Sequence, residues 1–231
     1  VSLAGVSPAF RELFGITSEE QAKNLGIVQM NQVFEDKNGS GATVTVKAAA
    51  ADQEQFYILV EFAAPEGTVL PEPDQVEEGF NRAVLWGGPD GRGIGFGAYR
   101  DESCTSFIGS SEAGYAIDYV EDSDPTDNKM EFIIRGHIDP MPKDAAYCLF
   151  SGIQSLCMQY QGEWVTMLDG MDIDLVVPLV GMGTHYDFQG RCGVNLNGVT
   201  LAVAENLTIS PISVSMDLVI PDLSLIHISE P

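Results

Sequence analysis

The chain has 231 residues, of which 45% are hydrophobic and 19% are charged. This balance is typical of a folded globular protein and excludes an intrinsically disordered chain. With 34 acidic and 11 basic residues, the formal net charge is −23. Such a charge repels phosphate backbones, which excludes nucleic acid as a partner. The length allows one large or two small domains.

The first predicted element is a short helix that follows an apolar or small segment, VSLAGV (Val1–Val6). Ser7 is a good N-cap, and Pro8 suits the first helical position because its missing N–H needs no partner there. Gly15 ends the helix. Helical spacing places three apolar residues on one face: Phe10, Leu13 and Phe14.

A second short helix is predicted from Thr17 to about Asn24. Thr17 and Glu20 have the spacing of a capping box, and Gly26 closes the helix. The chain therefore begins with a helical hairpin that carries one apolar face.

After Gly26 the apolar period changes from helical to two. ATVTVKAAA places Val44, Val46 and Ala48 on one side and Thr43, Thr45 and Lys47 on the other. FYILVEF places Phe56, Ile58, Val60 and Phe62 on one face. The polar turn ADQEQ between these segments predicts an antiparallel hairpin.

Many further short strands separated by turns predict a mainly β fold: two antiparallel, Ig-like β-sandwich modules after the helical hairpin. The proline-containing segment His137–Ala145 predicts the seam between the modules. Asn197-Gly198 predicts a tight hairpin in the second module. The predicted divisions are residues 1–29 for the N-terminal segment and hairpin, 30–138 for the first sandwich and 139–222 for the second.

The last nine residues, LSLIHISEP (Leu223–Pro231), follow a strand that already runs into a proline. They match the translation of a sequencing-library adapter, so we expect residues 223–231 to be an artefact and exclude them from the fold. This expectation favours a truncated N-terminus as well.

No metal or cofactor site is expected. Four cysteines, Cys104, Cys148, Cys157 and Cys192, lack the spacing of a zinc motif and allow three disulfide pairings, none of which the sequence selects. Cys148 and Cys157 could face each other across a hairpin, and buried free thiols are the alternative. The loop Asp36–Gly41 begins like a calcium-binding loop, but Lys47 stands where a bidentate Glu belongs, so we expect a turn.

Two further acidic segments are candidate sites. Glu121–Asn128 gathers carboxylates at Asp122, Asp124 and Asp127 without calcium-loop spacing, which indicates a solvated loop. The segment LDGMDIDL carries three carboxylates, Asp169, Asp172 and Asp174. An enzyme would need a cleft around them for acid–base catalysis. The alternative is that they form an outward polar face of a strand.

Other signs of catalysis are weak. The only imidazoles are His137, His185 and His227, and no serine nucleophile motif accompanies them. The glycines of GGPDGRGIGFG alternate along a strand instead of forming a phosphate loop, which indicates a bend or close packing, with Phe96 and Tyr99 packing over it. We therefore expect a protein that is not an enzyme.

One family resemblance covers most of residues 7–220. SPAFRELFG, then TVTVKAAAAD and FYILVEFAAPEG, resemble the extracytoplasmic domain of unknown function in Gram-positive, single-span membrane proteins similar to anti-sigma factors. NGVTLAVAENLTISPISVSM is similar to the closing strands of that family. The segment between Gly87 and Asp127 departs from the family pattern.

The resemblance implies a sensory or scaffold module outside the cell membrane. It implies a transmembrane helix before Val1, a cytoplasmic segment that binds a sigma factor, and an extracellular ligand. Val1–Val6 would then be the end of the span, whereas the six residues alone favour an ordinary N-terminal segment. Phe10, Leu13 and Phe14 would couple the module to the membrane.

The alternative is a secreted or wall-attached module that binds a glycan or a protein. Its stacking platform would be an exposed tryptophan, Trp86 or Trp164. The alternating segment WVTML favours a core position for Trp164, which leaves Trp86 as the candidate.

Overall fold

The computed structural model describes most of the chain. The described residues are 6–52, 54–68, 84–86, 95–111, 113–120, 124, 126–138, 142, 144–153, 155–160, 163–169, 171, 173–179, 184–186, 192–196 and 199–220. The segment 223–231, predicted to be an artefact, lies outside them.

Two short helices open the described chain, as predicted. In α1 (Pro8–Leu13), the Ser7 hydroxyl accepts a hydrogen bond from the Ala9 amide, and Gly15 follows the helix with a φ of 61°. The capping box of α2 (Glu19–Asn24) lies one residue later than predicted. Ser18 and Gln21 form it, because the Gln21 side chain reaches back to the Ser18 amide while the Ser18 hydroxyl accepts from the Gln21 amide.

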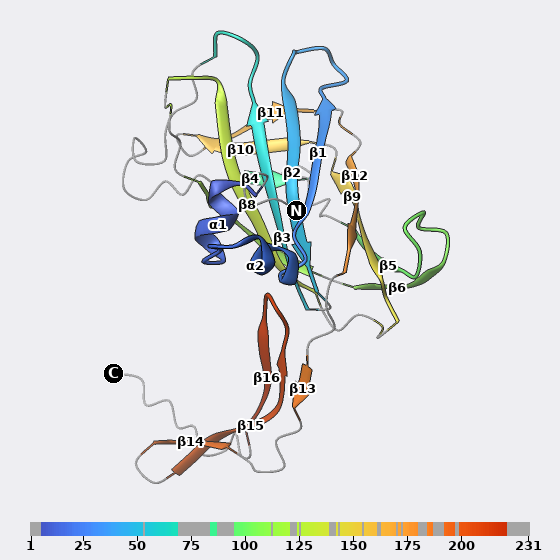
Figure 1. The fold of residues 1–231 in the computed structure, drawn as a ribbon. Coiled ribbons are helices and arrows are strands. Elements are labelled where there is room, and N and C mark those ends of the chain that lie inside the picture. The colour runs from blue at the N-terminus through green and yellow to red at the C-terminus, as the bar shows by residue number, and fades with distance from the viewer. Residues whose placement is uncertain are drawn as a thin grey trace. The chain divides into compact units, whose positions relative to one another are not determined.

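The largest sheet is antiparallel and can be followed in Figure 1. Its five strands lie in the order β1 (Val28–Glu35), β2 (Thr43–Ala51), β3 (Gln55–Ala63), β8 (Lys129–Ile138) and β7 (Ala113–Tyr119). The predicted hairpin of β2 and β3 is confirmed, with Thr43 opposite Ala63 and Ala51 opposite Phe56. The predicted inward face of β3 is also confirmed, since its four residues are buried in the core: Phe56, Ile58, Val60 and Phe62.

A β-bulge at Lys47 changes which residues of β2 face the core. Val46 pairs with Val60 and Ala48 with Leu59, which leaves Lys47 as the extra residue. The prediction that Ala48 shares the inner face with Val44 and Val46 was therefore wrong. The core on the inner face contains Ala49 and Ala51 after the bulge, whereas Ala48 is buried outside that core.

A second antiparallel sheet contributes to the same core. Its strands lie in the order β12 (Ile173–Pro178), β9 (Tyr147–Ile153), β5 (Gly95–Tyr99) and β6 (Phe107–Ser111). Three aromatic rings join the two sheets: Phe56 of β3 lies 5.3 Å from Phe96 of β5 and 4.8 Å from Phe150 of β9, between ring centroids. These contacts give the two sheets one shared hydrophobic core.

The first part of the chain also contains a three-stranded antiparallel sheet. It consists of β11 (Glu163–Leu168), β10 (Leu156–Tyr160) and β4 (Val84–Trp86). Leu156 and Leu168 bring this sheet into the same core.

The chain divides into two compact units, Val1–Val180 and Gly181–Pro231. The predicted seam at His137–Ala145 does not separate two modules, because β9, after the seam, pairs with β5, before it. Periodicity within single strands carries no information on such long-range pairing.

The second unit contains one antiparallel sheet. Its strands are β13 (Thr184–Tyr186), β14 (Cys192–Leu196), β15 (Val199–Ile209) and β16 (Val214–Val219). β15 pairs with each of the other three strands. Leu196 pairs with Val199, which confirms the hairpin predicted at Asn197-Gly198, although the turn itself lies outside the described residues.

Candidate functional site

The helical hairpin packs on the face of the largest sheet that points away from the core. Phe10 is fully buried, and its ring centroid lies 5.5 Å from that of Phe14. Phe14 in turn lies 5.0 Å from the ring of Tyr57, edge to face at 79°. Leu13 does not share this contact, because 43% of its surface is exposed. Of the three residues predicted on this face, Phe10 and Phe14 therefore take part in the contact and Leu13 does not.

Several other apolar residues of the hairpin segment are also buried. Val6, Ile16, Ala22 and Ile27 are buried along the hairpin segment. Helices of six residues have little stability of their own. The hairpin is therefore held by its packing on the sheet, where Phe14 contacts Tyr57 of β3; both helices are labelled in Figure 1.

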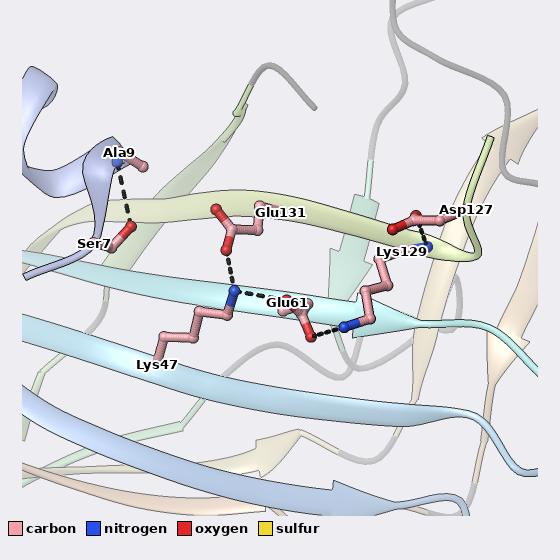
Figure 2. Close-up of polar contacts among 7 residues, drawn as sticks. All are labelled: Ser7, Ala9, Lys47, Glu61, Asp127, Lys129 and Glu131. Atoms are coloured by element: carbon pink, nitrogen blue, oxygen red, sulfur yellow. Dashed lines mark hydrogen bonds and ion pairs between the residues drawn. The ribbon is translucent and has the colours of Figure 1, made fainter. Parts of the chain in front are cut away.

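A network of charged side chains crosses three strands on this same outer face (Figure 2). The Lys47 ammonium, at the bulge in β2, lies 2.6 Å from a Glu61 carboxylate oxygen of β3 and also contacts Glu131 of β8. Lys129 of β8 lies 3.4 Å from the other oxygen of Glu61. In these four side chains, called the Lys47 network below, each ion pair joins a lysine to a glutamate.

Burial and charge act in opposite directions on these groups. Burial raises the pKa of Glu61, but its hydrogen bond and charge contact with Lys47 and the nearby Lys129 outweigh this, so the pKa lies below its ordinary value. Burial lowers the pKa of Lys47, but Glu131 and Glu61 outweigh it and hold the pKa above its ordinary value. Both groups are charged at neutral pH.

Tyr57 connects the hairpin contact to a second, exposed ion pair. Burial raises the pKa of its phenol, and the hydroxyl donates to Gln55 Oε1 at 3.1 Å. Arg135, its register partner on β8, pairs with Asp118 of β7 through a 2.5 Å Nε–Oδ2 contact. The outer face thus joins an aromatic contact to salt bridges that span four strands.

The acidic segment beginning at Asp36 forms a turn, as predicted. The Asp36 carboxylate accepts hydrogen bonds from the Asn38 and Ser40 amides, both at 3.1 Å. Hydrogen bonds from Ser40 and Asn38 hold its pKa below the ordinary value. Gly39 and Gly41 have φ of 75° and 85°, which side chains rarely adopt. The carboxylate serves the turn, which leads into β2.

In the other acidic segments, Asp124 is exposed and Asp127 is partly exposed. Asp124 accepts from the Thr126 hydroxyl and amide, and Asp127 accepts from the Lys129 amide, which makes a local turn. Asp169 and Asp174 are exposed, and Asp172 lies outside the described residues. Among the described residues, no group of three or more His, Cys, Asp or Glu side chains is arranged to hold a metal ion.

The described thiols are unpaired. Cys104, Cys148 and Cys157 are free, and the side chain of Cys192 is outside the described part. Cys148 and Cys157 do not face each other across a hairpin, because β9 and β10 belong to different sheets. Burial raises the pKa of Cys148 to about 12.

Several predicted site residues cannot be placed as side chains. Trp86 lies in β4 opposite Leu156, and Trp164 in β11 opposite Gln159, but both indoles fall outside the described side chains. The same holds for the imidazoles of His137 and His185, and His227 lies wholly outside the described residues.

The predicted packing of Phe96 and Tyr99 over the glycines of β5 is confirmed for Tyr99 only. Tyr99 packs over Gly97 as expected, since a Cβ at Gly97 would meet the Tyr99 ring at 2.8 Å. Phe96 instead points into the core. Tyr99 also contacts the exposed ring of Phe107 of β6, with centroids 5.6 Å apart. The position of Phe107 was missed because only strand register brings it beside Tyr99.

No helix in the described part of the chain combines the length and apolar character that a membrane crossing requires. No protein-family model matches the chain, and no curated protein matches it. Among solved structures, the chain is similar to the crystal structure of the conserved domain protein from Bacillus anthracis, with a TM-score of 0.52 and 13% sequence identity. The similarity covers 90% of this chain, which spans 60% of the length of the other. At this identity the likeness concerns the fold alone.

Proposed function

We propose that this chain is the extracytoplasmic, non-enzymatic sensory or scaffold module of a membrane-anchored regulator similar to anti-sigma factors. The anchor is a span before Val1, and a cytoplasmic segment beyond it binds the sigma factor. The two-sheet core is, in this proposal, an Ig-like sandwich that receives the signal. The regulators that the proposal refers to occur in Gram-positive bacteria, and the protein of similar fold comes from one such bacterium, Bacillus anthracis.

The observation that carries the proposal is the packing of Phe14 on Tyr57. Through this contact the segment nearest to the proposed anchor is attached to β3, the central strand of the largest sheet. A displacement of the sheet would therefore move the hairpin with it. A loosely tethered segment could not transmit such a displacement.

The anchor is tested by reading the gene upstream of the codon for Val1 in the same source DNA. A short basic segment followed by about 20 apolar residues is the expected result. A cleavable signal peptide ending near Val1 would overturn the membrane-anchored proposal and leave a secreted module.

The coupling is tested in the full-length protein with a sigma-dependent reporter. Phe14→Ser should change reporter output, because it removes the ring that contacts Tyr57. Leu13→Ser is the matched control, since Leu13 is exposed on the same helix. Unchanged output from a folded Phe14→Ser protein would contradict coupling through the hairpin.

The second candidate is a secreted or wall-attached binding module. Trp86, its predicted platform, has no described side chain. The observation that favours this candidate is a different aromatic surface, on the outer face of β5, β6 and β9.

A further inference from the structure

We infer that the outer face of the β5–β6–β9 sheet is a binding surface for an uncharged glycan. This inference gives the second candidate function a location and a ligand class. It concerns the isolated chain, and its test is independent of any membrane anchor.

Strand register places three aromatic residues in one row across this sheet. Tyr99 of β5 pairs with Phe107 of β6 on one side and with Tyr147 of β9 on the other. The alternate residues Ala98 and Phe150 belong to the core, so the row lies on the opposite, outer face. We call these three residues the aromatic row.

The row is accessible to a ligand. Phe107 is 58% exposed, although an aromatic ring gains free energy when it is covered. Tyr99 and Tyr147 are partly exposed. The faces of aromatic rings carry partial negative charge. They therefore attract the polarised C–H groups on the faces of sugar rings.

Beside Tyr99, strand β5 carries glycines, and the neighbouring strands β6 and β9 carry serine hydroxyl groups. Gly97 has no side chain, and Tyr99 leans over it, so the ring position depends on that glycine. Ser110, opposite Gly97 on β6, is exposed, and Ser151 lies opposite Gly95 on β9. Apolar rings with a few convergent polar groups are typical of small-ligand sites.

The charges near the row select against an anionic ligand. Arg100, next to Tyr99, is paired with Asp144 at 2.5 Å. The Asp101 carboxylate accepts hydrogen bonds from Ser103, Thr105 and Ser106 within its own turn. Arg100, the cation beside the row, is already paired, and Asp101 keeps its negative charge because its hydrogen-bond donors are neutral. Since the whole chain also carries −23, a neutral, hydroxyl-rich polymer fits this surface better than an anionic wall polymer or an acidic peptide.

The experiment is affinity gel electrophoresis of the purified chain. The neutral probes are soluble β-glucan, mannan, xylan and chitin oligomers, and lipoteichoic acid and a mixed peptide library are the comparison probes. At least one neutral glycan should retard the protein. Phe107→Ala should weaken that binding about tenfold, as loss of one well-placed aromatic contact does.

Gly97→Ala tests the geometry without removing a ring. Its Cβ would lie 2.8 Å from the Tyr99 ring and so displace it, and binding should fall although all three aromatics remain. Val33→Ala is the control, because Val33 is 60% exposed on the other sheet, and it should bind like the unmodified chain.

Folding of each variant is checked by its thermal unfolding midpoint. Phe107→Ala keeps the test decisive if Gly97→Ala fails to fold, since Phe107 is exposed. The inference is overturned if no neutral glycan retards the chain, if only lipoteichoic acid or peptides bind, or if folded Phe107→Ala binds unchanged.

Discussion

Phe14 lies edge to face against Tyr57, with ring centroids 5.0 Å apart, and this contact joins the N-terminal hairpin to the central strand of the largest sheet. Phe10 lies fully buried beside it. The hairpin is therefore part of the first unit and not an appendage to it.

Phe10→Ala should lower the free energy of unfolding by about 3–5 kcal/mol, the usual cost of a large buried cavity. Leu13→Ala, on the same helix but exposed, should change it by no more than about 0.5 kcal/mol. Urea unfolding of both variants measures the difference. Equal effects at the two positions would contradict the buried position of Phe10.

Lys47→Met should destabilise the first unit by about 1–3 kcal/mol, because it leaves Glu61 and Glu131 half-buried without their main cation. Val33→Met, also on the largest sheet, is an exposed control. A Lys47→Met protein as stable as the unmodified chain would show that the Lys47 network contributes nothing to stability.

The same network sets a pH window. The pKa of Glu61 is lowered when folded, so its contribution is present above its ordinary value of 4.5 and is lost as pH falls below it. The pKa of Lys47 is raised, so its contribution is present below 10.5 and is lost as pH rises above it. Urea midpoints from pH 3 to 11 should therefore fall less steeply at both ends in Lys47→Met. Identical pH profiles would contradict these shifts.

The turn at Asp101 predicts a separate acid effect. Hydrogen bonds from Ser103 and from the Thr105 and Ser106 backbone lower the pKa of Asp101 from 3.8 to about 2. The stabilisation is present above pH 3.8 and is lost as pH falls toward 2. The stability difference between Asp101→Ala and the unmodified chain should shrink across that interval. A difference that stays constant from pH 5 to pH 2 would contradict the assignment.

Thiol reactivity should follow burial. Iodoacetamide should modify Cys104, which is partly exposed, in the native protein. Cys148 and Cys157 are buried and should react only after unfolding, and burial also disfavours the Cys148 thiolate. Peptide mapping by mass spectrometry identifies each site. Native labelling of Cys148 at the rate of Cys104 would contradict the fold around β9.

Local features of the fold were predictable because local physical rules govern them. The cap at Ser7, the alternation in β3 and the β2–β3 hairpin all follow from residues close in sequence. The bulge at Lys47 was not predictable in this way. It depends on pairing with β1 and β3, and one extra residue reverses the face of every residue after it.

The same limit applies to the candidate sites. Phe10 and Phe14 were found from helical spacing, but spacing alone could not show that Leu13 would remain exposed. The aromatic row is a property of register, since Tyr99, Phe107 and Tyr147 are separated in sequence and meet only through strand pairing. The predicted seam was misplaced for the same reason.

Native-state hydrogen exchange tests the central claim, that the hairpin is coupled to the sheet, most directly. The amides of Arg11, Phe14, Ala22 and Leu25 are hydrogen-bonded within helices too short to protect them alone. The account predicts that these amides exchange with an opening free energy close to that of amides in β3. Exchange of the hairpin amides at nearly unprotected rates, while β3 stays protected, would contradict it.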